Sequence, residues 1–218
     1  MAASELLVLT QAARGCVACP LSGFRRNVVF GEGNPFSPLV LVGEGPGEEE
    51  DKTGRPFVGK AGKLLDQALA DCGLSRADVY ICNTVKCRAA DWSTGKPVNR
   101  APMPGEVAAC RQWLLPQLAA VNPWVILCIG SPSAKNLIRP LFKITQDRGK
   151  FCASEYAHVA IATLHPSYIL RNQYGGSDGG YSLLVADITK AWEAATKLQA
   201  ERGFRFANTP EAIESPSG

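Results

Sequence analysis

Four short, uninterrupted apolar runs do most to constrain the fold of this chain. They are Leu39–Val42, Val79–Cys82, Val125–Ile129 and Val159–Ala162. A strand with one face in water alternates apolar and polar residues, whereas a continuous run is typical of a strand buried on both faces. Such strands belong to parallel sheets that helices cover on both sides. The four runs therefore predict an α/β protein with a central parallel sheet.

Helical patterns separate the apolar runs. They lie near residues 61–72, 106–120 and 131–139, with a short helix at 4–13 and an amphipathic one near 182–200. Strands that alternate with helices indicate crossover connections within one sheet. Ligands in such folds bind beyond the carboxyl ends of the strands. We therefore expect the chemistry in the loops that begin at Gly43, Asn83, Gly130 and Leu164.

Composition excludes several classes of protein. The 218 residues are 46% hydrophobic and 20% charged, which is typical of a globular chain, and no apolar run approaches the roughly 18 residues of a membrane span. The first residues lack the basic region of a secretory signal. Gly54–Ala61 nearly matches a phosphate-binding loop, but Ala61 stands where a hydroxyl should reach magnesium. We therefore expect neither a membrane partner nor a nucleotide cofactor.

A single domain is expected over residues 1–202, with a flexible tail over 203–218.

Eight cysteines are the unusual feature of the composition. Without a secretory signal they are expected in a reducing compartment, where clustered thiols more often bind metal than form disulfides. Cys72, Cys82 and Cys128 lie in apolar settings and are interpreted as small buried residues, whereas Cys152 has no assignment. The remaining four combine a C-x2-C spacing with two cysteines beside basic residues, which favour thiolates: Cys16, Cys19, Cys87 and Cys110. Four thiolates suit either Zn²⁺ or a [4Fe–4S] cluster.

Two polar residues follow apolar runs at the predicted ligand-binding edge of the sheet. Glu44 lies in the Gly43–Gly47 turn after the first run, and His165 follows the last run. The segment Tyr168–Arg171 mixes apolar residues with a cation, as a wedge that enters a DNA duplex requires. Cations also cluster at Arg25–Arg26 and at Lys86 with Arg88, where the ordinary interpretation is a solvated face.

Together these motifs resemble the family 4 uracil-DNA glycosylases, an iron–sulfur class found in bacteria and archaea. The resemblance extends from about Cys16 to the final helix, and its carriers are Cys16-x2-Cys19, Gly43–Gly59, Asn83–Arg88, Asn99–Pro102, Cys110 and His165–Arg171. It implies a three-layer α/β/α sandwich with a four-stranded parallel sheet. It also implies a base-excision-repair enzyme that flips uracil out of DNA and hydrolyses its N-glycosidic bond, leaving an abasic site.

The resemblance also assigns residues to roles. The implied ligands of a [4Fe–4S] cluster are Cys16, Cys19, Cys87 and Cys110. The implied uracil pocket consists of Gly43, Glu44, Gly45, Phe57, Asn83 and His165. Within that pocket Glu44 and His165 are the expected catalytic residues, and Leu170 with Arg171 is expected to contact the DNA. The expected partner is uracil-containing DNA, bound by a monomer in the bacterial or archaeal cytosol.

One departure from the family leaves alternatives open. Residues 89–98 lengthen the interval between Cys87 and Cys110. The related uracil-DNA glycosylase X proteins carry an insertion here, with a histidine that cross-links to DNA. A glycosylase-like protein of that cross-linking type is therefore an alternative, although this chain has no histidine between Cys87 and Cys110. A second alternative is a non-catalytic nucleic-acid-binding module whose four cysteines hold zinc.

Overall fold

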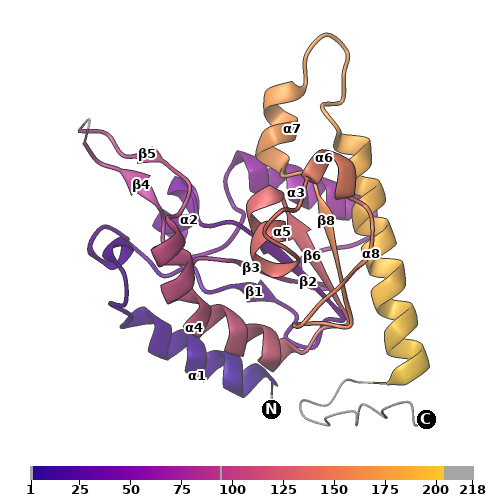
Figure 1. Ribbon diagram of the computed structural model, residues 1–218, viewed down its shortest axis with the longest axis horizontal. Coiled ribbons are helices and arrows are strands. Elements are labelled where there is room, and N and C mark those ends of the chain that lie inside the picture. Colours follow the sequence, from indigo (N-terminus) through magenta and orange to yellow (C-terminus); the bar gives the residue numbers. More distant parts are fainter. Residues whose placement is uncertain (1, 94, 204–218) are drawn as a thin grey trace, which may run out of the picture.

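A computed structural model describes residues 2–93 and 95–203 of the chain (Figure 1). Its main sheet has the strand order β1-β3-β2-β6-β8-β7. The four central strands are parallel and correspond to the four predicted runs: β3 (Tyr80–Asn83), β2 (Leu39–Gly43), β6 (Val125–Ile129) and β8 (Val159–Thr163). The flexible tail expected over residues 203–218 lies, apart from Gly203, outside the described residues.

The sheet is wider than the four strands that were expected. A two-residue strand, β1 (Glu32–Gly33), pairs antiparallel with β3, and a second one, β7 (Cys152–Ala153), pairs antiparallel with β8. The expected strand count was therefore not exact, although the four parallel strands form the centre of the sheet. Strands of two residues are too short to produce a hydrophobic period, so the sequence carries no signal for them.

Helices cover both faces of the sheet and complete three layers (Figure 1). One face carries α3 (Lys60–Asp71), α7 (Pro166–Asn172) and α8 (Tyr181–Arg202). The opposite face carries α1 (Ala2–Arg14), α4 (Pro104–Val121) and α5 (Ser131–Leu137). Side chains of β2 alternate between the two cores, since Leu39 and Leu41 pack on the first face and Val40 and Val42 on the second. This arrangement confirms the predicted α/β/α sandwich.

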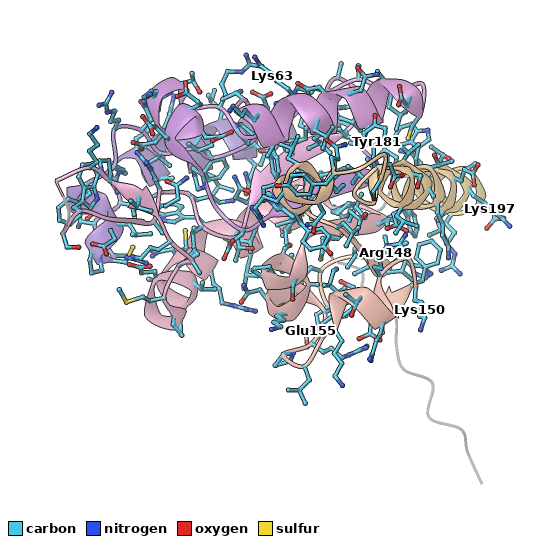
Figure 2. All side chains as sticks on the ribbon, turned by 90° about the horizontal axis from the view of Figure 1, so that it is seen from above. Lys63, Arg148, Lys150, Glu155, Tyr181 and Lys197 are labelled. Atoms are coloured by element: carbon cyan, nitrogen blue, oxygen red, sulfur yellow. The ribbon has the colours of Figure 1, made fainter. Side chains whose placement is uncertain are left out.

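The remaining elements are short. They are α2 (Glu48–Thr53), α6 (Ile144–Asp147), the 3-10 helix Pro20–Gly23 and a two-stranded sheet of β4 (Ala90–Asp91) and β5 (Val98–Asn99). The long helices were predicted, whereas α2, α6 and α7 were not. Lys63 and Lys197, on α3 and α8, point outward from the sheet (Figure 2). Among the helices of the described residues, none is both long and apolar enough to cross a membrane.

The insertion of residues 89–98 forms the hairpin β4–β5, which projects from the body of the molecule (Figure 1). At its base the Arg88 guanidinium donates a hydrogen bond to the Asn99 side-chain oxygen over 2.7 Å. Farther out, the Trp92 ring stacks on Phe24, with ring centroids 5.7 Å apart. The insertion is thus held against the segment that contains Cys16 and Cys19.

Burial differs sharply between two leucines of this fold. Leu41 on β2 is fully buried, whereas Leu141 is 84% exposed. We expect Leu41→Ala to lower the free energy of unfolding by about 2–5 kcal/mol, because it leaves a cavity between sheet and helices. The control Leu141→Ala should change it by less than about 0.5 kcal/mol. Denaturant unfolding of both variants measures the difference, and equal losses would contradict this packing.

Candidate active site

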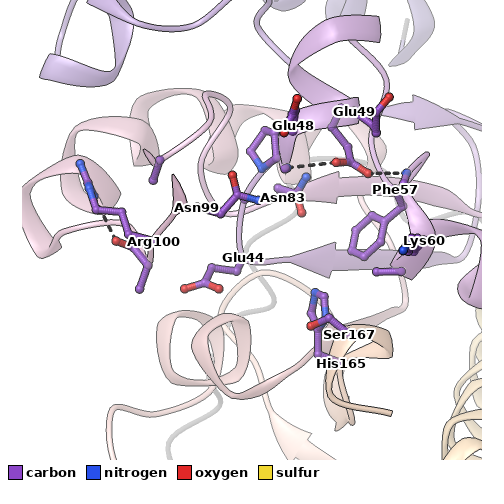
Figure 3. A pocket seen from close by; sticks show the side chains of 18 of the residues that line it. Glu44, Glu48, Glu49, Phe57, Lys60, Asn83, Asn99, Arg100, His165 and Ser167 are labelled. Carbon is purple, nitrogen blue, oxygen red and sulfur yellow. Dashed lines mark hydrogen bonds between the residues drawn. The ribbon is translucent and has the colours of Figure 1, made fainter. Parts of the chain in front are cut away.

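An open pocket of about 690 Å³ lies at the carboxyl edge of the central strands (Figure 3). The register places the ends of β2 and β3 side by side, because Gly43 pairs with Asn83. Of the predicted uracil-pocket residues, five line this pocket: Glu44, Gly45, Phe57, Asn83 and His165. Arg171 also lines it, whereas Leu170 is outside its lining and is 38% exposed on α7. The structure therefore brings the predicted residues together.

Gly43 forms a tightly packed base beneath the pocket. A Cβ atom at this position would lie 2.3 Å from Asn83 Oδ1 and 2.5 Å from Phe57 Cζ. A Cβ atom at Gly45 would lie 2.7 Å from a methyl carbon of Val85. Both glycines are therefore required by the close approach of side chains from neighbouring loops.

Phe57 is held in an unusual backbone conformation. Its φ of 53° lies in the left-handed region, which non-glycine residues adopt uncommonly. The Arg76 guanidinium donates hydrogen bonds to the carbonyl oxygens of Pro56 and Phe57, and Gly62 leaves room for the Phe57 carbonyl against α3. The Phe57 ring faces His165 across the pocket, with centroids 6.0 Å apart and planes inclined by 32°.

Glu50 fastens two loops of the pocket to each other. One carboxylate oxygen accepts hydrogen bonds of 2.8 Å from the amides of Val58 and Gly59, and the other accepts one of 3.1 Å from the Gly47 amide. Glu50 was not predicted as a site residue, because it lies within a run of four acidic residues that resembles a solvated surface segment. The one sequence feature that could have identified Glu50 is its position three residues after Gly47, where it completes the capping box of α2.

Asn83 is almost completely buried, and its side-chain oxygen has no hydrogen-bond partner within residues 2–93 and 95–203. Its main-chain carbonyl accepts a 2.8 Å hydrogen bond from the Lys86 ammonium group, which also bonds to the side-chain oxygen of Gln117. Gln117 in turn donates to the Phe30 carbonyl over 2.8 Å and to the Tyr80 hydroxyl over 3.0 Å. A buried polar network therefore fixes the end of β3.

Two cations of this region differ from their expected role on a solvated face. Lys86 is only 1% exposed and Arg88 only 7%. Arg88 bonds to Asn99 and lies 3.6 Å from a Glu48 carboxylate oxygen. Their sequence neighbours did not reveal this burial, because their partners come from α4, α2 and the hairpin.

Glu44 extends from the end of β2 into the pocket (Figure 3). Its side chain is half-buried, and this burial raises the pKa of its carboxyl group. Among the described residues, none pairs with this carboxylate in a hydrogen bond or an ion pair. The group is therefore available to a ligand or to water.

His165 caps the N-terminus of α7 through its own side chain. The Ser167 amide donates a hydrogen bond to His165 Nδ1 over 3.1 Å. Because an amide can only donate, Nδ1 is the unprotonated nitrogen, and the neutral ring carries its proton on Nε2. Burial lowers the pKa of His165 to about 4, with a further contribution from the positive charge of Arg171.

The lowered pKa of His165 gives a prediction that does not depend on catalysis. The imidazole should remain neutral as the pH falls from 7 to about 5, and should take up a proton only near pH 4. Nitrogen-15 NMR of the histidine side chains should show the Nε2–H tautomer of His165 throughout that range. The spectrum of His165→Asn supplies the assignment, and a midpoint near 6.5 would contradict the expected burial.

The four cysteines that were singled out as metal ligands line one small cavity beside the pocket region: Cys16, Cys19, Cys87 and Cys110. Arg25 donates to the Cys87 sulfur over 3.6 Å, and the Lys86 amide donates to the Cys110 sulfur over 3.2 Å. Burial raises the pKa of Cys87 to about 11 in the free thiol. Within the described part of the chain, no group of three or more His, Cys, Asp or Glu side chains has the arrangement of a single-ion site.

The other cysteines lie apart from this cavity, and all eight are free thiols. Cys82 and Cys128 are fully buried in β3 and β6, as predicted. Cys72 is only partly buried and accepts a hydrogen bond from the Thr189 hydroxyl over 3.3 Å. Cys152, which the sequence left unassigned, lies in the edge strand β7.

Comparisons with known proteins agree with this geometry. The model of the uracil DNA glycosylase superfamily matches residues 30–195. A type-4 uracil-DNA glycosylase of Thermotoga maritima is 45% identical over 185 residues, which cover 84% of this chain and 91% of that protein. One from Pyrobaculum aerophilum is 40% identical over 174 residues, with 77% and 85% covered. One from Archaeoglobus fulgidus is 43% identical over 162 residues, with 71% and 78% covered. The chain therefore belongs to the type-4 branch of the uracil-DNA glycosylase superfamily.

Proposed function

We propose that this protein excises uracil from DNA by hydrolysing the N-glycosidic bond, releasing the free base and leaving an abasic site. The observation that carries the proposal is the unpaired, buried side-chain oxygen of Asn83, in one pocket with the Glu44 carboxylate and the His165 ring. A buried acceptor without a partner costs about 1–3 kcal/mol, which a substrate donor would offset. A base turned out of the duplex brings such a donor.

Base recognition follows from Asn83 and Phe57. The Asn83 side-chain oxygen accepts a hydrogen bond from uracil N3–H, and its amide group donates to O4. Cytosine presents the opposite pattern at these two positions, so it would leave both groups unpaired in a buried site. The Phe57 ring stacks on the flipped base and recovers part of the cost of unstacking it.

His165 stabilises the departing base. Cleavage of the glycosidic bond leaves negative charge on uracil, and His165 Nε2–H donates a hydrogen bond to its O2 atom. The low pKa keeps the ring neutral near pH 7, so His165 acts as a fixed donor. Ser167 supports this role because its amide occupies Nδ1 and thereby keeps the proton on Nε2.

Glu44 is proposed to act on the attacking water and on the deoxyribose, whereas His165 acts on the base. Its unpaired carboxylate orients the attacking water and stabilises the positive charge that develops on the deoxyribose. The absent side chains of Gly43 and Gly45 leave room for the Asn83, Phe57 and Val85 side chains at the base of the pocket. Leu170 and Arg171, on the exposed side of α7, enter the space that the flipped base vacates.

The four clustered cysteines are proposed to hold a [4Fe–4S] cluster. The donor set fits, since four thiols surround one cavity and two N–H groups already donate to their sulfurs. Such clusters are held by four cysteinyl sulfurs, which is the number of cysteines that line this cavity. When bound, it supplies a cross-link among the N-terminal segment, the loop after β3 and α4, and hydrolysis needs no electron from it.

Cysteines that bind a cluster are typical of a reducing compartment, and the proposed substrate is DNA. We therefore place the protein in the cytosol of a bacterial or archaeal cell, acting as one domain and as a monomer.

An excision assay tests the proposal directly. The protein is incubated with a single-stranded oligonucleotide that contains one uracil, and abasic sites are then cleaved with alkali. We expect cleavage at the uracil, with a loss of about 10²–10⁴-fold in rate for Glu44→Gln and about 10²–10³-fold for His165→Asn. No cleavage at excess enzyme would overturn the proposal. A protein–DNA band that survives denaturation would instead indicate the cross-linking alternative.

The close packing at Gly43 provides a matched test of the pocket. Gly43→Ala would place a methyl group against Asn83 and Phe57, so excision should fall at least 100-fold while the fold remains intact. Gly105→Ala serves as the control, because a Cβ atom there meets nothing within 4 Å. Circular dichroism monitors the fold of both variants. Full excision by Gly43→Ala would show that this contact does not shape the substrate site.

A further inference from the structure

The indole nitrogen of Trp113 is a buried donor without a hydrogen-bond partner among the residues that the structure describes. Four buried side-chain nitrogen or oxygen atoms lack a hydrogen bond within residues 2–93 and 95–203: Asn83 Oδ1, Trp113 Nε1, Ser133 Oγ and Thr163 Oγ1. Trp113 contributes the one nitrogen of this set. A hydroxyl can rotate toward a partner and can also accept, whereas an indole N–H can only donate from a fixed position.

Trp113 lies beside the proposed cluster ligands. It is three residues after Cys110 on α4, so the two side chains occupy the same face of the helix, one turn apart. Both residues line the cavity that Cys16, Cys19 and Cys87 also line. The residue that carries the unpaired donor is therefore in the wall of the cavity where the four thiols converge.

The unpaired indole N–H of Trp113 indicates that an acceptor is missing from its surroundings. An unsatisfied buried donor costs about 1–3 kcal/mol, and most buried polar side chains have a partner. The uracil pocket contains the corresponding case, since Asn83 Oδ1 awaits a donor from the base. In the cysteine cavity the missing partner must be an acceptor, and sulfur is an acceptor for N–H groups, as the contacts of Arg25 and Lys86 with two of the cysteines illustrate.

We propose that Trp113 Nε1–H donates a hydrogen bond to a sulfur atom of the cluster, either a cysteinyl sulfur or an inorganic sulfide. This inference rests on the [4Fe–4S] cofactor proposed above. Hydrogen bonds to the sulfurs are among the factors that set the reduction potential of such clusters. The donor stabilises the more negative, reduced form, so it raises the potential. Trp113 is thus a residue that contacts the cofactor and lies outside the lining of the proposed uracil pocket.

The test uses Trp113→Phe in the cluster-loaded enzyme, because phenylalanine keeps an aromatic ring and loses the donor. Trp192→Phe is the matched control, since Trp192 is partly buried in α8 and packs in the core on the opposite face of the sheet. We expect the reduction potential to shift to more negative values in Trp113→Phe and to stay unchanged in the control. Iron–sulfur stretching bands in the resonance Raman spectrum should respond less to deuterium oxide in Trp113→Phe than in the parent protein. An unchanged potential and an unchanged deuterium response would overturn the inference.

Two further measurements separate this inference from the proposed cofactor. Iron and acid-labile sulfide are first determined in the parent protein, and a protein with one zinc and no sulfide would overturn the cofactor itself. If Trp113→Phe fails to retain the cluster, benzothienylalanine at position 113 replaces only the indole N–H by sulfur at the same ring size. A shift of the reduction potential to more negative values in that variant would support the hydrogen bond. A reduction potential equal to that of the parent protein would exclude the hydrogen bond.

Discussion

The parallel pairing of β2 with β3 is the constraint on which the site depends. The register pairs Gly43 with Asn83, so the loop that carries Glu44 after one strand and the Asn83 amide at the end of the other are neighbours. The absence of a side chain at Gly43 then lets Asn83 and Phe57 meet at that junction. Because β6 and β8 continue the same sheet, His165 reaches the pocket from its other side.

Much of this arrangement was accessible from the sequence, because it follows from local pattern. Continuous apolar runs identify buried parallel strands, and the rule that ligands bind at their carboxyl ends brings Glu44 and His165 to one edge without any contact being known. The four cysteines were recognised by spacing and by their basic neighbours, and they line one cavity. These inferences need only the order of elements along the chain.

The residues that hold the site loops in place could not be predicted from the sequence, because their roles depend on contacts between distant segments. Glu50 appears within an acidic run as one more solvated charge, yet it accepts hydrogen bonds from three amides in two loops. Arg76 fixes the carbonyls beside Phe57 from the turn after α3. Lys86 resembled a surface cation, although its partner Gln117 is 31 residues away and both are buried. A single sequence gives no period or spacing that predicts such pairs.

The short segment from Asn83 to Cys87 ends in two different sites. Its first residue lines the pocket at the carboxyl edge of the sheet, and its last lines the cysteine cavity. Lys86 lies between them and bonds to the Asn83 carbonyl through its side chain and to the Cys110 sulfur through its amide. Four peptide bonds are too few to absorb a displacement at either end. If the roles proposed above hold, base selection and cofactor binding are coupled through this segment, so a redesign of the pocket at Asn83 has to preserve the position of Cys87 four residues later.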